Sequence, residues 1–261
     1  PELLDQGLKV IDLSGDFRLK DGSLYPGWYG FDPAPSAYLD QAVYGLSEIY
    51  RDQIAQATFI ANPGCYPTAT LLGLYPLVKE GWINLEQVII DAKSGVSGAG
   101  RKASLGTHFS EVNENLKVYK LAAHQHIPEI EQILSDMAQQ PMTVTFTTHL
   151  VPMTRGIMCT MYTRLDRGKS MSDVVELYRA TYEHHPFVRI RPEGTWPATK
   201  EVYGSNYCDI GFAHDQRTGQ LIVISVIDNV VKGAAGQAIQ NMNIMYGFDE
   251  TAGLFHLPIY P

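Results

Sequence analysis

Apolar residues along the chain follow two spacings, and each spacing predicts one type of element. Short runs rich in β-branched and apolar residues, bounded by turn-forming residues, predict strands. These runs cover residues 8–13, 57–62, 87–93, 142–150, 156–165, 187–191, 207–213 and 220–228. A short polar stretch with a glycine joins the last two runs, and it predicts an antiparallel hairpin.

Apolar residues at helical spacing predict helices over residues 67–79, 128–139, 172–184 and 232–246. Pro67 and Pro128 stand at the start of two of them, where a first helical turn favours proline. Residues 18–50 are rich in aromatic side chains and predict a long ordered loop that these side chains pack. Strands and helices alternate early, whereas strands dominate from residue 142 onward. The pattern predicts an α/β segment followed by an α+β domain with a mixed, mostly antiparallel sheet.

Composition narrows the class of protein. The 261 residues are 45% hydrophobic and 18% charged, which is typical of a soluble globular protein. The net charge of −8 disfavours nucleic acid and anionic membrane surfaces as partners, and the apolar runs are too short to span a bilayer. Three widely spaced cysteines indicate neither a disulfide framework nor a thiolate metal cage, and we expect a reducing, cytoplasmic location.

Cys65 stands in the stretch "IANPGCYPTATLLGLYP", residues 60–76. Pro63 and Gly64 force a turn after a strand, so the thiol is expected beside a helix N-terminus. Unpaired N–H groups and the helix dipole favour a thiolate there, and a thiolate is a nucleophile. The alternative is a small buried hydrophobic residue, the usual role of a lone cysteine.

His124 and His126 in "AAHQHIPEI" provide candidate bases. In an extended chain an H-x-H pair points both rings to one face. A metal site needs a third ligand, and no nearby pattern supplies one, so acid/base catalysis is favoured and no metal is predicted. The other possibility is a pair of half-buried rings that hold a loop. A helix N-terminus and a thiolate act oppositely on an imidazole, which predicts a pKa near the operating pH.

Residues 60–76 resemble the active-site signature of the N-acetyl-γ-glutamyl-phosphate reductase family, and more distantly that of aspartate-semialdehyde dehydrogenase. Further segments agree in order between about residues 8 and 247: "VIDLSGDFRL", "SGVSGAGRKA", "HQHIPEI", "GSNYCDIGF" and "IDNVVKGAAGQAIQ". In "RGIMC", Ile157 occupies the place where the aspartate enzyme has its base histidine, which favours the first family. The first family usually has an arginine between the two histidines, and this chain has Gln125.

The resemblance implies the C-terminal part of a Rossmann-type NAD(P)-binding domain, followed by a substrate and dimerisation domain like the C-terminal domain of glyceraldehyde-3-phosphate dehydrogenase. The expected bounds are 1–64 for the nucleotide-binding part, 65–228 for the catalytic domain and 229–261 for a C-terminal helix that returns to the first part. The glycine-rich turn that holds the cofactor pyrophosphate is not found in these residues. We therefore expect a chain that carries only the final strands of that domain.

The resemblance also implies site roles. Cys65 is the nucleophile, and His126, ahead of His124, is the base. Substrate-binding residues are expected at Arg18 for the acyl phosphate, Asn62 for the acyl group, and Arg101 and Arg155 for phosphate or carboxylate. Cofactor-binding residues are expected at Ser14, Ser97, Gly98 and Asn229, and the implied cofactor is NADP.

The implied activity is NADPH-dependent reduction of N-acetyl-γ-glutamyl phosphate in arginine biosynthesis, through a cysteine thioester, by a homodimer or homotetramer. Two other functions stay open. The chain without its pyrophosphate-binding turn is either this enzyme or a substrate-binding and oligomerising module without turnover. A Cys–His hydrolase shares the nucleophile but predicts turnover without NADPH.

Overall fold

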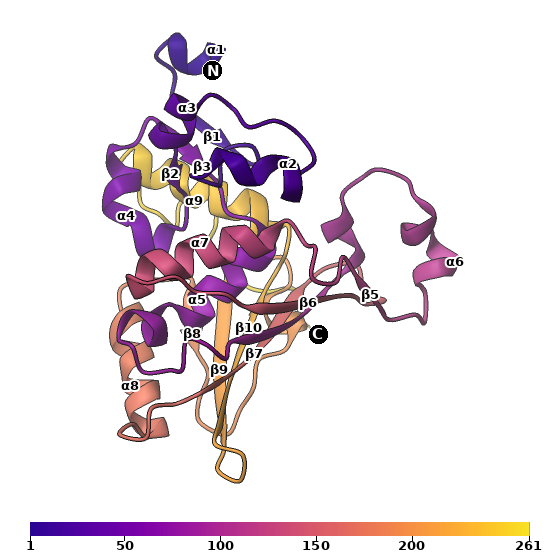
Figure 1. The fold of residues 1–261 in the computed structure, drawn as a ribbon, viewed down its shortest axis with the longest axis vertical. Helices are drawn as coiled ribbons and strands as arrows, with labels where there is room; N and C mark the ends of the chain where they lie inside the picture. The colour runs from indigo at the N-terminus through magenta and orange to yellow at the C-terminus, as the bar shows by residue number, and fades with distance from the viewer. Residues whose placement is uncertain (261) are drawn as a thin grey trace.

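The computed structural model describes residues 1–260, in which the strands form a small sheet and a large one. The small sheet has the order β1 (Val10–Asp12), β3 (Phe59–Ala61), β2 (Val43–Tyr44), and all its strands are parallel. Figure 1 shows it at one end of the molecule, beside α4 (Ser47–Gln56) and α9 (Gly236–Met245). The two strands predicted at 8–13 and 57–62 are confirmed, and the structure pairs them with each other.

The segment predicted as a long loop, residues 18–50, contains regular structure, so that prediction was wrong in part. It forms α2 (Tyr25–Trp28), α3 (Ser36–Gln41), strand β2 and the first turn of α4, and α1 (Glu2–Asp5) precedes it. These elements are too short to show a helical or alternating period. The aromatic packing is present, because the rings of Tyr25, Tyr29 and Phe31 contact one another.

The large sheet has seven strands in the order β5-β6-β4-β7-β10-β9-β8. Strands β4 and β6, and β8 and β9, pair in parallel, and the other neighbours pair antiparallel. The strands span β4 Ile89–Ser94, β5 Lys117–Tyr119, β6 Thr145–Leu150, β7 Ile157–Arg164, β8 Val188–Ile190, β9 Cys208–Asp215 and β10 Gln220–Ile227. The predicted hairpin is confirmed as β9–β10, whereas β5 was not predicted.

Helices α5 (Cys65–Lys79), α7 (His126–Ala138) and α8 (Met171–Tyr182) bury their apolar side chains in one core with the sheet. Helix α5 is buried along most of its length and contains Pro76. Proline lacks an N–H group, so the carbonyl of Leu72 has no helical partner. The Tyr182 hydroxyl of α8 donates to this carbonyl at 2.6 Å, so α8 satisfies the group that Pro76 leaves unpaired.

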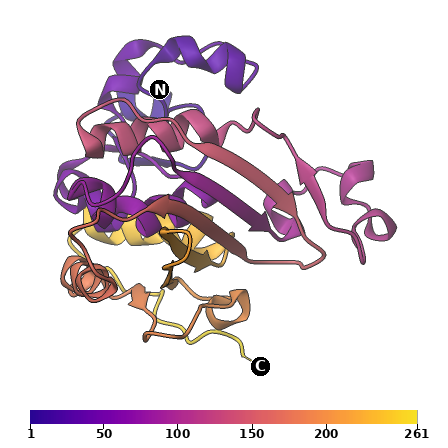
Figure 2. The same ribbon diagram turned by 60° about the horizontal axis from the view of Figure 1, so that its bottom comes forward.

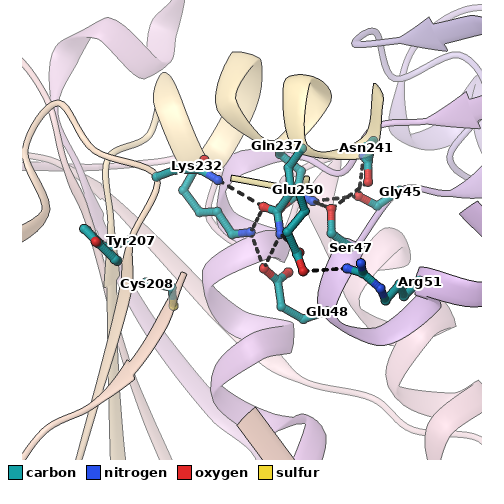
Figure 3. Close-up of polar contacts among 12 residues, drawn as sticks. Gly45, Ser47, Glu48, Arg51, Tyr207, Cys208, Lys232, Gln237, Asn241 and Glu250 are labelled. Atoms are coloured by element: carbon teal, nitrogen blue, oxygen red, sulfur yellow. Dashed lines mark hydrogen bonds and ion pairs between the residues drawn. The ribbon is translucent and has the colours of Figure 1, made fainter. Parts of the chain in front are cut away.

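The chain returns to the small sheet after β10. A π-helical turn, Val231–Ala235, leads into α9. The fully buried Lys232 ammonium donates to Glu48 of α4 at 2.6 Å, a contact shown in Figure 3. It also donates to Gln240 of α9 at 2.8 Å. Buried charges are stable when paired in this way, so the ion pair ties the π-helical turn to the small-sheet region.

Residues 100–116, which contain α6 (Phe109–Val112), project from the rest of the molecule in both views (Figures 1 and 2). No helix within residues 1–260 is long and apolar enough to cross a membrane.

Candidate active site

Cys65 is the first residue of α5. Strand β3 ends at Ala61, the turn of Asn62, Pro63 and Gly64 follows, and Gly64 caps the helix. The helix therefore begins two residues before Pro67, where the sequence predicted its start. The thiol lies at the helix N-terminus as predicted, and it is partly exposed to a pocket.

His126 is the first residue of α7, again two residues earlier than predicted. Its ring lies against Gly64, because a β-carbon built on Gly64 would be 2.4 Å from His126 Nε2. The backbone N–H of His126 donates to Nδ1 of His124 at 3.1 Å, and the two ring centroids are 4.7 Å apart. The His124 ring thus accepts the first N–H group of α7, whose N-cap residue is Gln125, while Nδ1 of His126 has no partner among residues 1–260.

The protonation states differ from those that the sequence indicated. Burial raises the pKa of the Cys65 thiol to about 11, although the Arg18 guanidinium acts in the opposite direction. Burial also lowers the pKa of His124 to about 4 and that of His126 well below its usual value, with the neighbouring ring and Arg18 adding to the effect at His126. Desolvation outweighs the helix N-terminus, so the thiol and both imidazoles are neutral at pH 7.

Glu129 is a site residue that the sequence reasoning missed. Its carboxylate is fully buried and accepts hydrogen bonds from the Gly64 N–H at 2.8 Å and from the Tyr44 hydroxyl at 2.7 Å. It also lies 3.5 Å from the Arg18 guanidinium. Glu129 therefore connects α7 to the turn before Cys65. Its place in the first turn of the helix predicted at 128–139 gave no signal for this contact.

Arg18 and Asn62 lie in the same pocket as Cys65. Arg18 donates to the carbonyls of Asn62 at 2.8 Å and Leu13 at 2.9 Å. The Asn62 side chain donates to the Ala234 carbonyl at 3.2 Å and accepts from Asn241 of α9 at 3.1 Å. Both polar groups are thus positioned before any substrate binds.

Gly233 of the π-helical turn backs the nucleophile. A β-carbon on Gly233 would be 2.8 Å from the Cys65 β-carbon, so only glycine allows this approach. Since Lys232 is the neighbour of Gly233, the buried ion pair of Figure 3 also fixes one wall of the site.

The pocket has a volume of about 640 Å³, and three of the four predicted cofactor residues, Ser97, Gly98 and Asn229, line it. The Asn229 amide donates to the Ser97 hydroxyl at 2.9 Å and accepts from the Gly156 N–H at 2.7 Å. A β-carbon on Gly98 would be 2.7 Å from the Ser94 hydroxyl oxygen, so the absent side chain keeps this wall open. These residues fit a flat polar ring such as a nicotinamide.

Three predicted residues do not line this pocket. Ser14 is exposed and donates to Asp12 at 2.6 Å. Arg155 lies 3.5 Å from the Asp228 carboxylate and over the ring of Tyr203, and Arg101 lines a separate hollow that the projecting segment helps to form. Their roles stay predictions. Among residues 1–260 no three His, Cys, Asp or Glu side chains gather as metal ligands.

The fold and this site are those of the semialdehyde dehydrogenase class. Residues 1–57 match the family described as "Semialdehyde dehydrogenase, NAD binding domain", and residues 65–229 match "Semialdehyde dehydrogenase, dimerisation domain". The structure resembles aspartate semialdehyde dehydrogenase II from Vibrio cholerae with a TM-score of 0.70 at 18% identity, over 95% of this chain and 75% of that one. It also resembles the aspartate semialdehyde dehydrogenase of Candida albicans with NADP, with a TM-score of 0.63 at 16% identity, over 94% and 72%.

Sequence identity shows to which family within this class the chain belongs. The chain is 64% identical over its whole length to the N-acetyl-gamma-glutamyl-phosphate reductase of Geobacillus stearothermophilus, of which it covers 76%. It is 56% identical over its whole length to the same enzyme of Bacillus subtilis strain 168, again covering 76%. The chain belongs to the N-acetyl-gamma-glutamyl-phosphate reductase family, as the motifs around Cys65 predicted.

Proposed function

We propose that the pocket around Cys65 reduces N-acetyl-γ-glutamyl phosphate to N-acetylglutamate 5-semialdehyde and phosphate with NADPH, a step of arginine biosynthesis. The observation that carries this proposal is the position of Cys65 and His126 at the first residues of two packed helices, with the imidazole against Gly64. Membership of the family supports the substrate assignment.

Because the thiol and the imidazole are both neutral, attack requires a proton transfer. The His126 imidazole accepts the thiol proton while the sulfur attacks the acyl carbon, and the bond from that carbon to the phosphate oxygen breaks. The electron pair leaves with phosphate beside Arg18, and phosphate takes a proton from water. The product of this half-reaction is a Cys65 thioester.

NADPH, when bound, supplies the hydride that reduces the thioester, and Ser97, Gly98 and Asn229 are the residues that would hold its nicotinamide. The imidazolium of His126 then donates its proton to the oxygen that becomes negative on the acyl carbon. Cleavage of the carbon–sulfur bond releases the aldehyde, and the same proton returns to the Cys65 sulfur through the imidazole. His126 is placed for this task better than His124, because Nδ1 of His124 accepts a backbone hydrogen bond.

The test is reductase activity of Cys65→Ser and Cys65→Ala alongside the wild type. We expect both variants to retain the wild-type fold by circular dichroism and to lose roughly a thousandfold or more in kcat. Wild-type activity in Cys65→Ala would refute the proposal. Saturable binding of NADPH, followed by fluorescence, separates an enzyme from a binding module without turnover. We further expect a homodimer or homotetramer, to be measured by sedimentation.

A further inference from the structure

The pocket is lined by three cationic side chains, Arg18, Lys117 and Lys120. Arg18 donates to two backbone carbonyls and faces Glu129. The Lys117 ammonium donates to the Gly106 carbonyl at 2.8 Å, which fixes the base of the projecting segment. The Lys120 ammonium instead donates to the side-chain oxygen of Gln125, a residue that also lines the pocket. A side-chain amide can release a cation to a ligand more readily than a fixed backbone carbonyl.

The backbone at Lys120 is held in an unfavourable conformation. Lys120 has φ of 45° and Ala122 has φ of 52°, both in the left-handed region that glycine adopts without steric cost. These residues lie between β5 and His124, in the turn that carries the chain to the histidines. This backbone conformation fixes the path of the turn that carries Lys120 to the pocket. The turn places the Lys120 ammonium near both rings, and its charge adds to the effect of burial in lowering the pKa of His124 and His126.

The chemistry proposed above requires two separate anion sites. The substrate has a phosphate that departs and an α-carboxylate that stays with the acyl group while it is bound to Cys65. A cation that holds the retained carboxylate must differ from the one that accompanies the phosphate. Arg18 and Lys120 both line the pocket and come from different parts of the chain, one after β1 and the other after β5.

We propose that the Lys120 ammonium, oriented by Gln125, binds the α-carboxylate of the substrate and so selects amino-acid derivatives over simple acyl phosphates. The identity of this ligand rests on the proposed function. A charge-assisted hydrogen bond to a carboxylate is among the stronger contacts that a pocket can offer, and an ammonium on a flexible stem adapts to a substrate that changes shape during reaction.

A binding experiment tests the inference without turnover. The probes for calorimetry are N-acetyl-L-glutamate, whose γ-carboxylate takes the place of the acyl phosphate, and 4-acetamidobutyrate, which lacks only the α-carboxylate. We expect wild type to prefer N-acetyl-L-glutamate by about tenfold or more, Lys120→Met to lose this preference, and Lys120→Arg to keep most of it. Lys102→Met is the matched control, because Lys102 is exposed on a neighbouring loop outside this pocket, and it should behave as wild type. Equal affinity of wild type for the two probes, or no binding of either, overturns the proposal.

Kinetics in the reverse direction test whether Lys120 binds the carboxylate or the phosphate. With N-acetylglutamate 5-semialdehyde, phosphate and NADP, Lys120→Met should raise the KM for the semialdehyde about tenfold and leave the KM for phosphate within about twofold of wild type. A rise in the KM for phosphate would assign Lys120 to the phosphate and overturn the proposal. Absence of turnover in wild type would refute the proposed function, whereas the calorimetric comparison would still decide the role of Lys120.

Discussion

The imidazole of His126 packs directly on the α-carbon of Gly64, the residue before Cys65. A β-carbon at this position would be 2.4 Å from Nε2, which is shorter than any allowed contact between non-bonded atoms. Since Gly64 has φ of −66° and ψ of 157°, an ordinary extended conformation, the need for glycine here is steric and not conformational. The approach of the proposed base to the turn that carries the proposed nucleophile therefore depends on one absent methyl group.

Gly64→Ala should displace the imidazole while the backbone conformation stays allowed. We expect kcat to fall about a hundredfold, because a displacement of roughly 1 Å between reacting groups has that effect. Gly27→Ala is the matched control, since a β-carbon there meets nothing within 4 Å, and it should leave kcat unchanged. A wild-type kcat in Gly64→Ala would show that His126 is not the base.

Alkylation of Cys65 in the ligand-free protein should report the effect of burial. Iodoacetamide reacts with the thiolate, and burial raises the pKa of Cys65 to about 11, so the rate should keep rising with pH up to about 11. Mass spectrometry after timed quenching measures the rate at each site. Cys159 and Cys208 are fully buried and should stay unmodified in the folded protein. A rate that levels off near pH 7 would contradict this account.

The buried rings should make folding stability fall with acid. The unfolded His124 takes up a proton below its usual pKa near 6.5, whereas the folded residue does so only near its pKa of about 4. The contribution of this pKa difference to the free energy of unfolding is then fully present above pH 6.5. It is lost as pH decreases toward 4, which lowers the free energy of unfolding by roughly 3 kcal/mol. His124→Gln should weaken this dependence of the unfolding free energy on pH, measured by urea titrations at several pH values. The substitution His184→Gln at an exposed residue should not change it. The same pH dependence of the unfolding free energy in His124→Gln and in wild type would exclude a buried neutral His124.

Glu129→Gln tests the carboxylate that joins α7 to the turn before the nucleophile. The amide keeps an acceptor for the Gly64 N–H but leaves the buried Arg18 without its opposing charge. The free energy of unfolding should fall by about 3 kcal/mol. The surface substitution Glu86→Gln should cost less than about 0.5 kcal/mol in the same urea titration. Equal stability of both variants would mean that Arg18 does not depend on Glu129.

The ion pair between Lys232 and Glu48 should show strong non-additivity. Lys232→Met alone leaves a buried carboxylate without a partner and should cost about 4 kcal/mol. Adding Glu48→Leu should recover part of this loss, because an apolar pair replaces the charges. The free energy of unfolding of the two single variants and the double variant gives the coupling energy. Simple additivity of the three values would exclude the pairing shown in Figure 3.

The sequence predicted the longer elements because their periods are clear. The hairpin of β9 and β10 and the helices α5, α7, α8 and α9 fall where apolar spacing indicated them, apart from shifts of one to a few residues at their ends. Helices α5 and α7 begin earlier than predicted, at Cys65 and His126, with Gly64 and Gln125 as their N-cap residues, so the prolines lie inside the first turn. Short elements such as β2 and β5 were not predicted, because two or three residues are too few to show a period.

The candidate site was predictable where a local motif carries it. The turn at Cys65 places the thiol at a helix start, and the H-x-H segment brings the His126 ring against Gly64, while the catalytic role of this ring stays a prediction. Contacts between distant segments were not predictable from one sequence. Glu129 meets Gly64, and Gly233 meets Cys65, only because helix packing brings them together. The pKa directions failed for the same reason: burial is a property of the packed molecule.

The packing of α5 along α7 has an evolutionary consequence. Loops accept insertions and deletions far more readily than packed helices do. Since Cys65 and His126 stand at the first residues of these two helices, we expect that lengthening or replacing the segment that carries α6 leaves their separation unchanged. Changes in that segment, which contributes Ser104, Gly106 and Thr107 to the pocket, can therefore reshape the pocket without moving the thiol or the ring.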